Sequence, residues 1–262
     1  MDKMTIAVTG AANGIGAELS KLLVAGGHQV VALDLVEPEF EVSDFIQIDL
    51  SDPTSIKGAI AKVPSLNGLC NCAGLPPRRG LETKILAVNF LGTRALTAGL
   101  ESQLSEGASI VNLASRAGAR WQAGAEQVKR LAGVDWDGLA DFVLSESIDP
   151  VRAYDLSKEA IILWTMANSE RLSNKGLRIN SISPGAIETR ILEDFATAFG
   201  DRMAKNVERA GRAGLPAEVA RLAAFLLSPE SHWIKGSDLP IDGGMTAFMT
   251  SDALALDVLS DA

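Results

Sequence analysis

Tyr154 and Lys158 are the residues whose types and spacing point most directly to chemistry. In a helix, a spacing of four residues places two side chains on one face, so the phenol and the ammonium group would be neighbours. A phenol ordinarily titrates near a pKa of about 10, and a nearby cation favours the ionised form. We therefore expect Tyr154, the only tyrosine of the chain, to exchange a proton with an alcohol oxygen near neutral pH. An ordinary exposed Tyr and Lys on an amphipathic helix is the alternative.

A glycine-rich turn near the N-terminus indicates a phosphate-binding site. It stands between an expected strand and an expected helix and reads Thr9-Gly10-Ala11-Ala12-Asn13-Gly14-Ile15-Gly16. Glycines allow positive φ angles and let the backbone approach a pyrophosphate, which would lie at the positive N-terminus of the helix. The spacing differs from the general Gly-x-Gly-x-x-Gly pattern, and a glycine turn without a ligand is the alternative. Its position favours a dinucleotide.

Asp34 ends the second expected strand and bears on the choice of dinucleotide. A carboxylate there can accept hydrogen bonds from the adenosine ribose hydroxyls, whereas it repels a 2′-phosphate. Ala11, Asn13 and Leu35 also offer no positive charge to such a phosphate. We therefore expect NAD rather than NADP, with a solvated strand-end acid as the alternative for Asp34.

The elements that would position these residues alternate along the chain. Short apolar or β-branched runs predict seven strands at 5–9, 29–33, 45–48, 68–72, 109–114, 177–183 and 237–241. Apolar residues at three-and-four spacing predict helices at 15–25, 55–63, 85–104, 155–174 and 217–227. This alternation predicts an α/β fold, a Rossmann-type doubly wound sheet of mostly parallel strands with helices on both faces. No linker or repeat interrupts it, so residues 1–262 are expected to form a single domain.

Residues 116–151 depart from the alternation. They separate the fifth strand from the next helix by more than a usual connection, and they contain helical patterns at 121–131 and 139–144. We expect a helical insertion here, followed by a helix that opens at Tyr154.

The composition narrows the function classes. The formal net charge of −9, with no basic run, argues against nucleic acid as a partner. The N-terminus lacks a signal-peptide pattern and no apolar run approaches the roughly 20 residues that span a bilayer, so we expect a cytoplasmic protein without a membrane partner. Cys70 and Cys72 would share one strand face as reduced packing residues. His28 and His232 are isolated from any metal-ligand spacing, so no metal is expected.

Seven features, in family order, make the chain resemble the short-chain dehydrogenases/reductases over nearly all of its length. They are the turn from Thr9 to Gly16, Asn71-Cys72-Ala73-Gly74, Asn89, Ser115, Tyr154 with Lys158, Pro184-Gly185-Ala186-Ile187-Glu188-Thr189, and Ile241-Asp242-Gly243-Gly244. Cys72 departs from the family's second asparagine, and the connection from Gly74 to Asn89 is short. The resemblance implies an oxidoreductase that moves a hydride between a nicotinamide and a small-molecule alcohol or ketone.

The resemblance also implies a catalytic role for four residues, Asn89, Ser115, Tyr154 and Lys158. Ser115 would donate a hydrogen bond to the substrate oxygen and stabilise its developing charge. Lys158 would bind the nicotinamide ribose and lower the pKa of Tyr154, and Asn89 would hold a water that links Lys158 to solvent.

Cofactor binding is implied in the same way for a larger set, to which Tyr154 and Lys158 also belong. Its other members are Gly10, Ala12, Asn13, Gly14, Ile15, Gly16, Asp34, Asp49, Leu50, Asn71, Ala73, Gly74, Pro184, Gly185, Ile187 and Thr189. Asp49 and Leu50 would contact the adenine, and the segment from Asn71 to Gly74 would line the middle of the cofactor. The backbone of Ile187 and the hydroxyl of Thr189 would bind the carboxamide. A core or turn role is the alternative, above all for Asp49 and Asn71.

The long insertion and the short connection before Asn89 resemble the branch that contains bacterial 3α-hydroxysteroid dehydrogenase/carbonyl reductase and coniferyl-alcohol dehydrogenase. An insertion beside Ser115 is placed to cover a largely apolar secondary or aromatic alcohol, such as a hydroxysteroid, aryl or terpenoid alcohol. The residues expected to enclose it are Trp121, Trp136, Phe142, Ile191, Leu192 and Phe195. With about equal weight, the insertion packs against the body or alters a subunit interface. The family is commonly oligomeric, and we expect a homodimer rather than a tetramer.

Two other functions stay open at this stage. An NADPH-dependent carbonyl reductase would differ mainly at Asp34. A non-catalytic nucleotide-sensing protein would keep the fold without the chemistry, which the intact Ser115, Tyr154 and Lys158 argue against. A hydrolase is disfavoured, because Ser115 lacks the Gly-x-Ser-x-Gly elbow.

Overall fold

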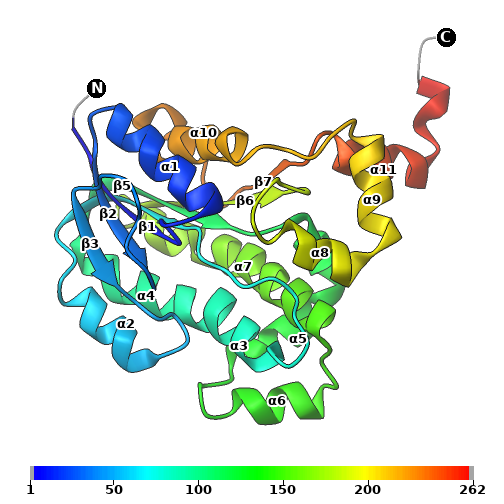
Figure 1. The fold of residues 1–262 in the computed structure, drawn as a ribbon, viewed down its shortest axis with the longest axis horizontal. Helices are drawn as coiled ribbons and strands as arrows, with labels where there is room; N and C mark the ends of the chain where they lie inside the picture. The colour runs from blue at the N-terminus through cyan, green and yellow to red at the C-terminus, as the bar shows by residue number, and fades with distance from the viewer. Residues whose placement is uncertain (1–2, 260–262) are drawn as a thin grey trace.

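A computed structural model describes residues 3–259 and has a seven-stranded sheet at its centre (Figure 1). The strands are β1 (Thr5–Thr9), β2 (Gln29–Asp34), β3 (Asp44–Gln47), β4 (Leu66–Asn71), β5 (Leu104–Leu113), β6 (Arg178–Pro184) and β7 (Asp238–Ile241). All neighbours pair in parallel, in the order β3-β2-β1-β4-β5-β6-β7. The sequence-based prediction of a doubly wound α/β sheet is confirmed.

Helices cover both faces of the sheet, as predicted (Figure 1). Helices α1 (Gly14–Ala25) and α10 (Pro216–Leu227) pack together on one face, over a core that includes Ile6, Val111 and Leu226. Helices α2 (Pro53–Ile60), α4 (Thr93–Leu100) and α7 (Pro150–Ser173) cover the other face. Parallel strands buried on both faces read as continuous apolar runs, which is why the sequence located them.

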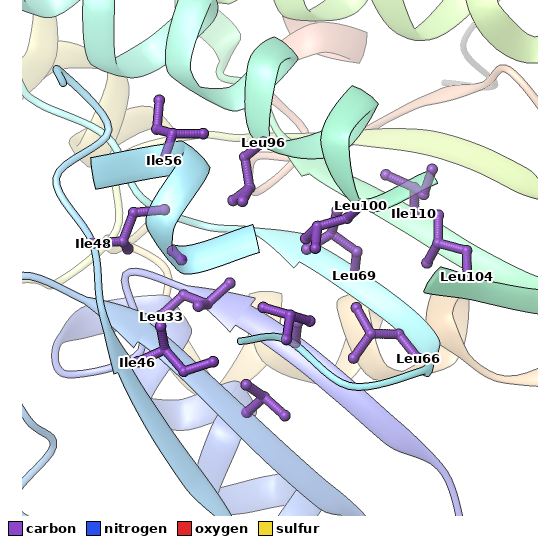
Figure 2. Packing of buried hydrophobic residues seen from close by; sticks show 14 of the residues in the cluster. Leu33, Ile46, Ile48, Ile56, Leu66, Leu69, Leu96, Leu100, Leu104 and Ile110 are labelled. Atoms are coloured by element: carbon purple, nitrogen blue, oxygen red, sulfur yellow. The ribbon is translucent and has the colours of Figure 1, made fainter. Parts of the chain in front are cut away.

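Close packing joins the second face to its helices. Figure 2 shows Leu33, Leu69 and Ile110 of the sheet facing Leu96 and Leu100 of α4. All five side chains are fully buried. This layer fixes the carboxyl ends of β1, β2, β4 and β5 at one edge of the sheet, where parallel strands of this topology bind ligands.

The single helix predicted over 85–104 is wrong. The chain instead forms α3 (Glu82–Leu86), a π-helical turn (Ala87–Gly92), α4 and a 3₁₀ turn (Glu101–Gln103) before β5 begins at Leu104. A π turn accommodates an extra residue and re-aims the side chains that follow, and such turns cluster at functional sites. Asn89 lies in this turn.

Helix α7 begins at Pro150, so Tyr154 lies in its second turn and does not open it. Asp149 caps the helix, because its Oδ1 accepts a hydrogen bond of 2.7 Å from the backbone N–H of Arg152. Proline is well suited to the first helical position, where no N–H is needed. This Asp-Pro start signal was present in the sequence and was missed.

The predicted insertion is helical and consists of α5 (Trp121–Ala132) and α6 (Leu139–Ser145). Helix α5 packs against α7, and α6 against α3. Glu159 of α7 is buried beneath Gly124 of α5 and is paired with Arg152, at 2.9 and 2.6 Å. Arg152 also donates to Gln127 of α5 at 2.8 Å. The insertion is thereby attached to the helix that carries Tyr154.

Three helices in the C-terminal part of the chain were not predicted. They are α8 (Leu192–Phe199), α9 (Asp201–Arg209) and α11 (Met245–Leu254) (Figure 1). A bidentate pair between Arg209 and Asp252, at 2.6 and 2.9 Å, links α9 to α11. Within residues 3–259, none of the helices has the length and apolar character that a membrane crossing requires.

Candidate active site

A cavity of about 650 Å³ lies at the carboxyl ends of the strands. Most of the residues predicted to bind cofactor or substrate line it. These are Gly10, Asn13, Gly14, Ile15, Gly16, Asp34, Asp49, Leu50, Ala73, Gly74, Ser115, Tyr154, Lys158, Pro184, Gly185, Ile187 and Thr189. Ala12, Asn71 and Asn89 are not among the lining residues and have other surroundings, described below.

The turn after β1 has the shape that its glycines permit. Gly10 and Gly14 have φ angles of +65° and +58°, in the region that disfavours side chains. A Cβ on Gly10 would lie 2.9 Å from the backbone of Ala73, and one on Gly16 would overlap the carbonyl oxygen of Gly10. A Cβ on Gly14 would meet Thr189 at 3.5 Å. The turn therefore forms a bare backbone cradle at the start of α1, which suits a pyrophosphate.

Asp34 is held at the end of β2 by backbone donors. Its Oδ2 accepts a hydrogen bond of 2.9 Å from Ala12, and its Oδ1 accepts one of 2.7 Å from Leu35. The carboxylate lines the cavity. Ala12 thus holds Asp34 through its N–H, and its role in cofactor binding stays a prediction.

Asp49 lies at the same end of the cavity, after β3. Burial raises the pKa of its carboxyl, but hydrogen bonds from Ser51 and the charge of Lys84 outweigh this, and the net pKa is lowered. The Oδ1 atom accepts from the Ser51 hydroxyl at 2.6 Å and from its N–H at 2.8 Å. Asp49 is therefore an ionised, fixed acceptor that lines the cavity.

Ser115, Tyr154 and Lys158 meet at the other end. Ser115 follows β5 and accepts a hydrogen bond of 3.1 Å from Ala117, which starts the turn of residues 116–120. Lys158 is buried and donates a hydrogen bond of 2.8 Å to the Leu113 carbonyl, with its Nζ 5.6 Å from the centre of the Tyr154 ring. The helical spacing predicted from sequence does bring the phenol and the ammonium group together.

The electrostatics of Tyr154 differ from the prediction. Tyr154 is 7% exposed, and the ring of Phe195 lies edge-on to it at 5.1 Å. Burial raises the pKa of the phenol well above its ordinary value, and the hydrogen bond with Ser115 offsets this only in part. Burial also lowers the pKa of Lys158 to about 8. The expected lowering of the phenol pKa by Lys158 is absent here, because desolvation dominates and only the Ser115 hydrogen bond acts against it.

Asn89 is placed by the π turn and donates a hydrogen bond to the catalytic helix α7. Its Nδ2 donates to the Leu75 carbonyl at 3.0 Å and to Ser157 Oγ at 3.2 Å, and its Oδ1 accepts from the Leu75 N–H at 2.7 Å. A Cβ on Gly74 would lie 3.3 Å from Asn89 Oδ1 and 3.6 Å from Lys158 Nζ. Asn89 therefore holds the loop after β4 beside Lys158. A water held here stays a prediction.

The prediction that Asn71 lines the cofactor site is corrected. The side chain is 3% exposed and points into the core, where its Nδ2 donates to Thr97 at 3.0 Å and to Asn112 at 2.8 Å. It joins β4 to β5 and α4, which is the structural role weighed as the alternative.

The two cysteines are free, as predicted, with their sulfurs 3.4 Å apart. Cys70 is buried, but Cys72 lines the cavity and is not simply a packing residue. The strand predicted from the sequence ran to Cys72, whereas β4 ends at Asn71. Cys72 therefore lies just outside the sheet, where it reaches the cavity.

The residues that line the substrate end of the cavity are only in part those predicted from the sequence. Ile191, Leu192 and Phe195 line it as expected. Trp121, Trp136 and Phe142 of the insertion do not, because they pack against the cores beneath α3 and α7. The other lining residues near Tyr154 were missed, and they include Arg116, Phe199, Arg202, Met203, Met245 and Met249. The apolar spacing over 192–207 was the signal that would have indicated a helix there.

Two ion pairs border this end. Arg116, which follows Ser115, is paired with Asp242 at 3.2 Å and also contacts Thr246, so it joins the serine segment to α11. Arg78 donates to Asp194 of α8 at 2.8 and 2.7 Å, and this pair joins the loop after β4 to α8. The segments around the cavity are therefore held by charge pairs.

Known proteins are similar to this chain in sequence and in fold. A model of the short chain dehydrogenases matches residues 4–126, and a model described as enoyl-(acyl carrier protein) reductase matches residues 140–246. Coniferyl-alcohol dehydrogenase of Pseudomonas sp. is 35% identical over 92% of this chain and 96% of its own.

The chain belongs to the short-chain dehydrogenase/reductase family.

Two further members of this family strengthen the comparison. The 3α-hydroxysteroid dehydrogenase/carbonyl reductase of Comamonas testosteroni is 31% identical over 93% of this chain and 97% of its own. A crystal structure of 3α-hydroxysteroid dehydrogenase from Pseudomonas sp., complexed with NADH, superimposes with a TM-score of 0.83 at 32% identity and covers 94% of this chain and 98% of its own. This short-chain dehydrogenase/reductase thus resembles members named for aromatic and steroid alcohols.

Proposed function

We propose that the protein is an NAD-dependent alcohol dehydrogenase and ketone reductase acting on an apolar secondary or aromatic alcohol. One observation carries the proposal: a single cavity has a bare glycine cradle and Asp34 at one end, and Ser115, Tyr154 and Lys158 at the other. A dinucleotide is long enough to need both ends, and the reacting alcohol needs only the second.

The residues at the first end fit a nicotinamide dinucleotide. At Gly10 and Gly16 the backbone packs too closely for any side chain, and this tight turn leaves the N-terminus of α1 uncovered for a pyrophosphate. Asp34 would accept from the adenosine ribose hydroxyls, while Ile187 and Thr189 would hold the carboxamide. When bound, the cofactor accepts or supplies the hydride.

Asp34 supports NAD over NADP. The carboxylate is fixed by backbone donors at the position where a 2′-phosphate would have to enter, and no cation among the lining residues from Leu33 to Leu35 would offset the repulsion. Lys84, which also lines the cavity and helps lower the pKa of Asp49, is the cation on which an NADPH-dependent alternative would depend.

Proton transfer falls to Tyr154. The buried phenol is protonated at neutral pH and is therefore ready to donate to a ketone oxygen, and Ser115 would donate a second hydrogen bond to that oxygen. In the oxidative direction the phenol first passes its proton to the relay through Lys158, and the phenolate then accepts the proton of the alcohol. Lys158, with a pKa near 8, is poised to share protons with this phenol, and we assign it and Asn89 to the relay toward solvent.

The walls favour an apolar substrate. Ile191, Leu192 and Phe195 line the cavity near Tyr154, together with methionines from α9 and α11. Methionine and phenylalanine side chains adapt to rings. The relatives named for coniferyl alcohol and for 3α-hydroxysteroids support the same substrate class.

The test is NADH absorbance with purified protein, NAD and a panel of hydroxysteroids, benzylic, cinnamyl and terpenoid alcohols. Tyr154→Phe should lose turnover by roughly 100-fold or more, because the general acid is removed, while calorimetry should find NAD binding retained. NADP in place of NAD should support less turnover. An unchanged rate in Tyr154→Phe, or absence of NAD binding by the wild type, contradicts the proposal.

A further inference from the structure

The cations that line the cavity are not all balanced by acids. Arg116 is paired with Asp242, and Arg212 with Glu218 at 2.6 Å. The remaining lining acids, Asp34 and Asp49, belong to the adenosine end. Arg190 and Arg202 also line the cavity, and within residues 3–259 neither forms an ion pair within 4.0 Å. Both arginines are exposed to solvent, which stabilises them without a protein partner, so their charge is available to an anionic ligand in the cavity.

The two arginines face different ends of the ligand. Arg190 directly follows Thr189, whose methyl group lies beside Gly14 of the glycine cradle. A pyrophosphate held in that cradle would account for its charge. Arg202 lies on α9 and is exposed to solvent, so its charge is available to a second anion.

Arg202 is connected to the reacting end by a series of aromatic rings. The Tyr154 and Phe195 rings are 5.1 Å apart, and the Phe195 and Phe199 rings stack at 6.2 Å. The guanidinium of Arg202 lies 6.0 Å from the centre of the Phe199 ring. Apolar surface therefore separates the proton donor from the cation, as the body of a ring-containing alcohol would require.

One acid interacts electrostatically with this cation without forming an ion pair with it. Asp155 is within electrostatic range of Arg202, but it does not line the cavity and makes no ion pair with it. Asn206 follows Arg202 by four residues, which is one helical turn, and also lines the cavity. An amide and a guanidinium on one helix face provide the donors that a carboxylate accepts.

We propose that the outer end of the substrate cavity binds a carboxylate that the substrate carries far from its reacting hydroxyl, with Arg202 as the specificity-determining residue and Asn206 as the second donor. This inference rests on the proposed function. It narrows the substrate class to ring-containing alcohols or ketones that bear an acid at the opposite end.

The experiment compares matched pairs of substrates, each an acid and its methyl ester. Suitable pairs are a 3-hydroxysteroid with a carboxylic side chain and 4-(hydroxymethyl)cinnamic acid. The variants are Arg202→Met, which removes the charge, and Lys205→Met, a matched control on the same helix whose side chain does not line the cavity. Binding of each acid to the NAD-loaded protein is measured by calorimetry beside the kinetics.

The wild type should favour the acid over its ester. Arg202→Met should lower kcat/KM for the acid by about tenfold, chiefly through KM, and leave the ester unchanged, because one charge-assisted contact is lost. The effect should shrink at high salt, and Lys205→Met should behave as the wild type. Equal losses for acid and ester, or the same loss in Lys205→Met, overturn the carboxylate site.

Failure of this inference can be told from failure of the proposed function. If the ester is oxidised but the acid has no advantage, the carboxylate site is overturned and the dehydrogenase activity stands. If neither is oxidised while the acid still binds the wild type more tightly than it binds Arg202→Met, the site is supported and the proposed activity fails.

Discussion

The buried pair between Arg152 and Glu159 should determine how firmly the insertion is attached to the catalytic helix. The Glu159 side chain is 2% exposed and that of Arg152 is 30% exposed, with both carboxylate oxygens bonded. Arg152→Met would leave the Glu159 charge buried under Gly124 without its partner. Removing one member of a buried pair costs about 3–5 kcal/mol, and the partial exposure of Arg152 puts the expectation near 3 kcal/mol. For a chain of this length that corresponds to roughly 10 °C in Tm.

Urea denaturation followed by circular dichroism measures this cost. The double variant Arg152→Met with Glu159→Met should recover about 2 kcal/mol of the loss, because no unpaired charge remains. Arg130→Met, which breaks the exposed pair with Glu146, is the matched control and should leave the denaturation midpoint unchanged. Since residues of the insertion beyond Ala117 do not line the cavity, kcat/KM of the folded single variant should equal that of the wild type.

The reasoning would be refuted if Arg152→Met were no more destabilising than Arg130→Met, or if the two single losses simply added in the double variant. A large fall in kcat/KM without loss of stability would instead show that the insertion acts on the substrate site.

Three other changes test separate parts of the site. Asp34→Ala should lower kcat/KM with NAD by roughly 10- to 100-fold and raise the relative rate with NADP, because ribose acceptors are lost and repulsion is relieved; an unchanged ratio of initial rates contradicts this. Gly16→Ala should weaken NAD binding in calorimetry by more than about tenfold, since its Cβ would overlap the Gly10 carbonyl, whereas Gly58→Ala, with open space around it, should bind normally. Burial raises the pKa of Asp155 to about 6 in the folded state, above its value in the unfolded chain. This difference stabilises the fold at low pH, where the carboxyl is protonated in both states, and the stabilisation is lost as the pH rises through about 6. The wild type should therefore be less stable, relative to Asp155→Asn, at about pH 8 than at about pH 5, and a pH-independent difference would exclude this linkage.

The sequence by itself determined the features that depend on near neighbours along the chain. Apolar or β-branched runs located all seven strands, most clearly the inner ones, which are mostly buried on both faces, whereas the edge strands β3 and β7 are partly exposed. The four-residue spacing of Tyr154 and Lys158 follows from helix geometry, and the glycine turn follows from the φ angles that only glycine adopts readily. These relations involve few residues, so tertiary packing does not alter them.

Only the tertiary structure decided how each side chain is solvated and paired. Asn71 and Asn89 were both assigned to the site from family motifs, yet one is turned into the core and the other holds a loop beside Lys158. The phenol of Tyr154 is desolvated by Phe195, a residue of a helix that the sequence-based prediction missed. Burial, ion pairing and the absence of an ion pair at Arg202 depend on residues far apart in the chain. The resulting pKa values are therefore set only once the chain is folded.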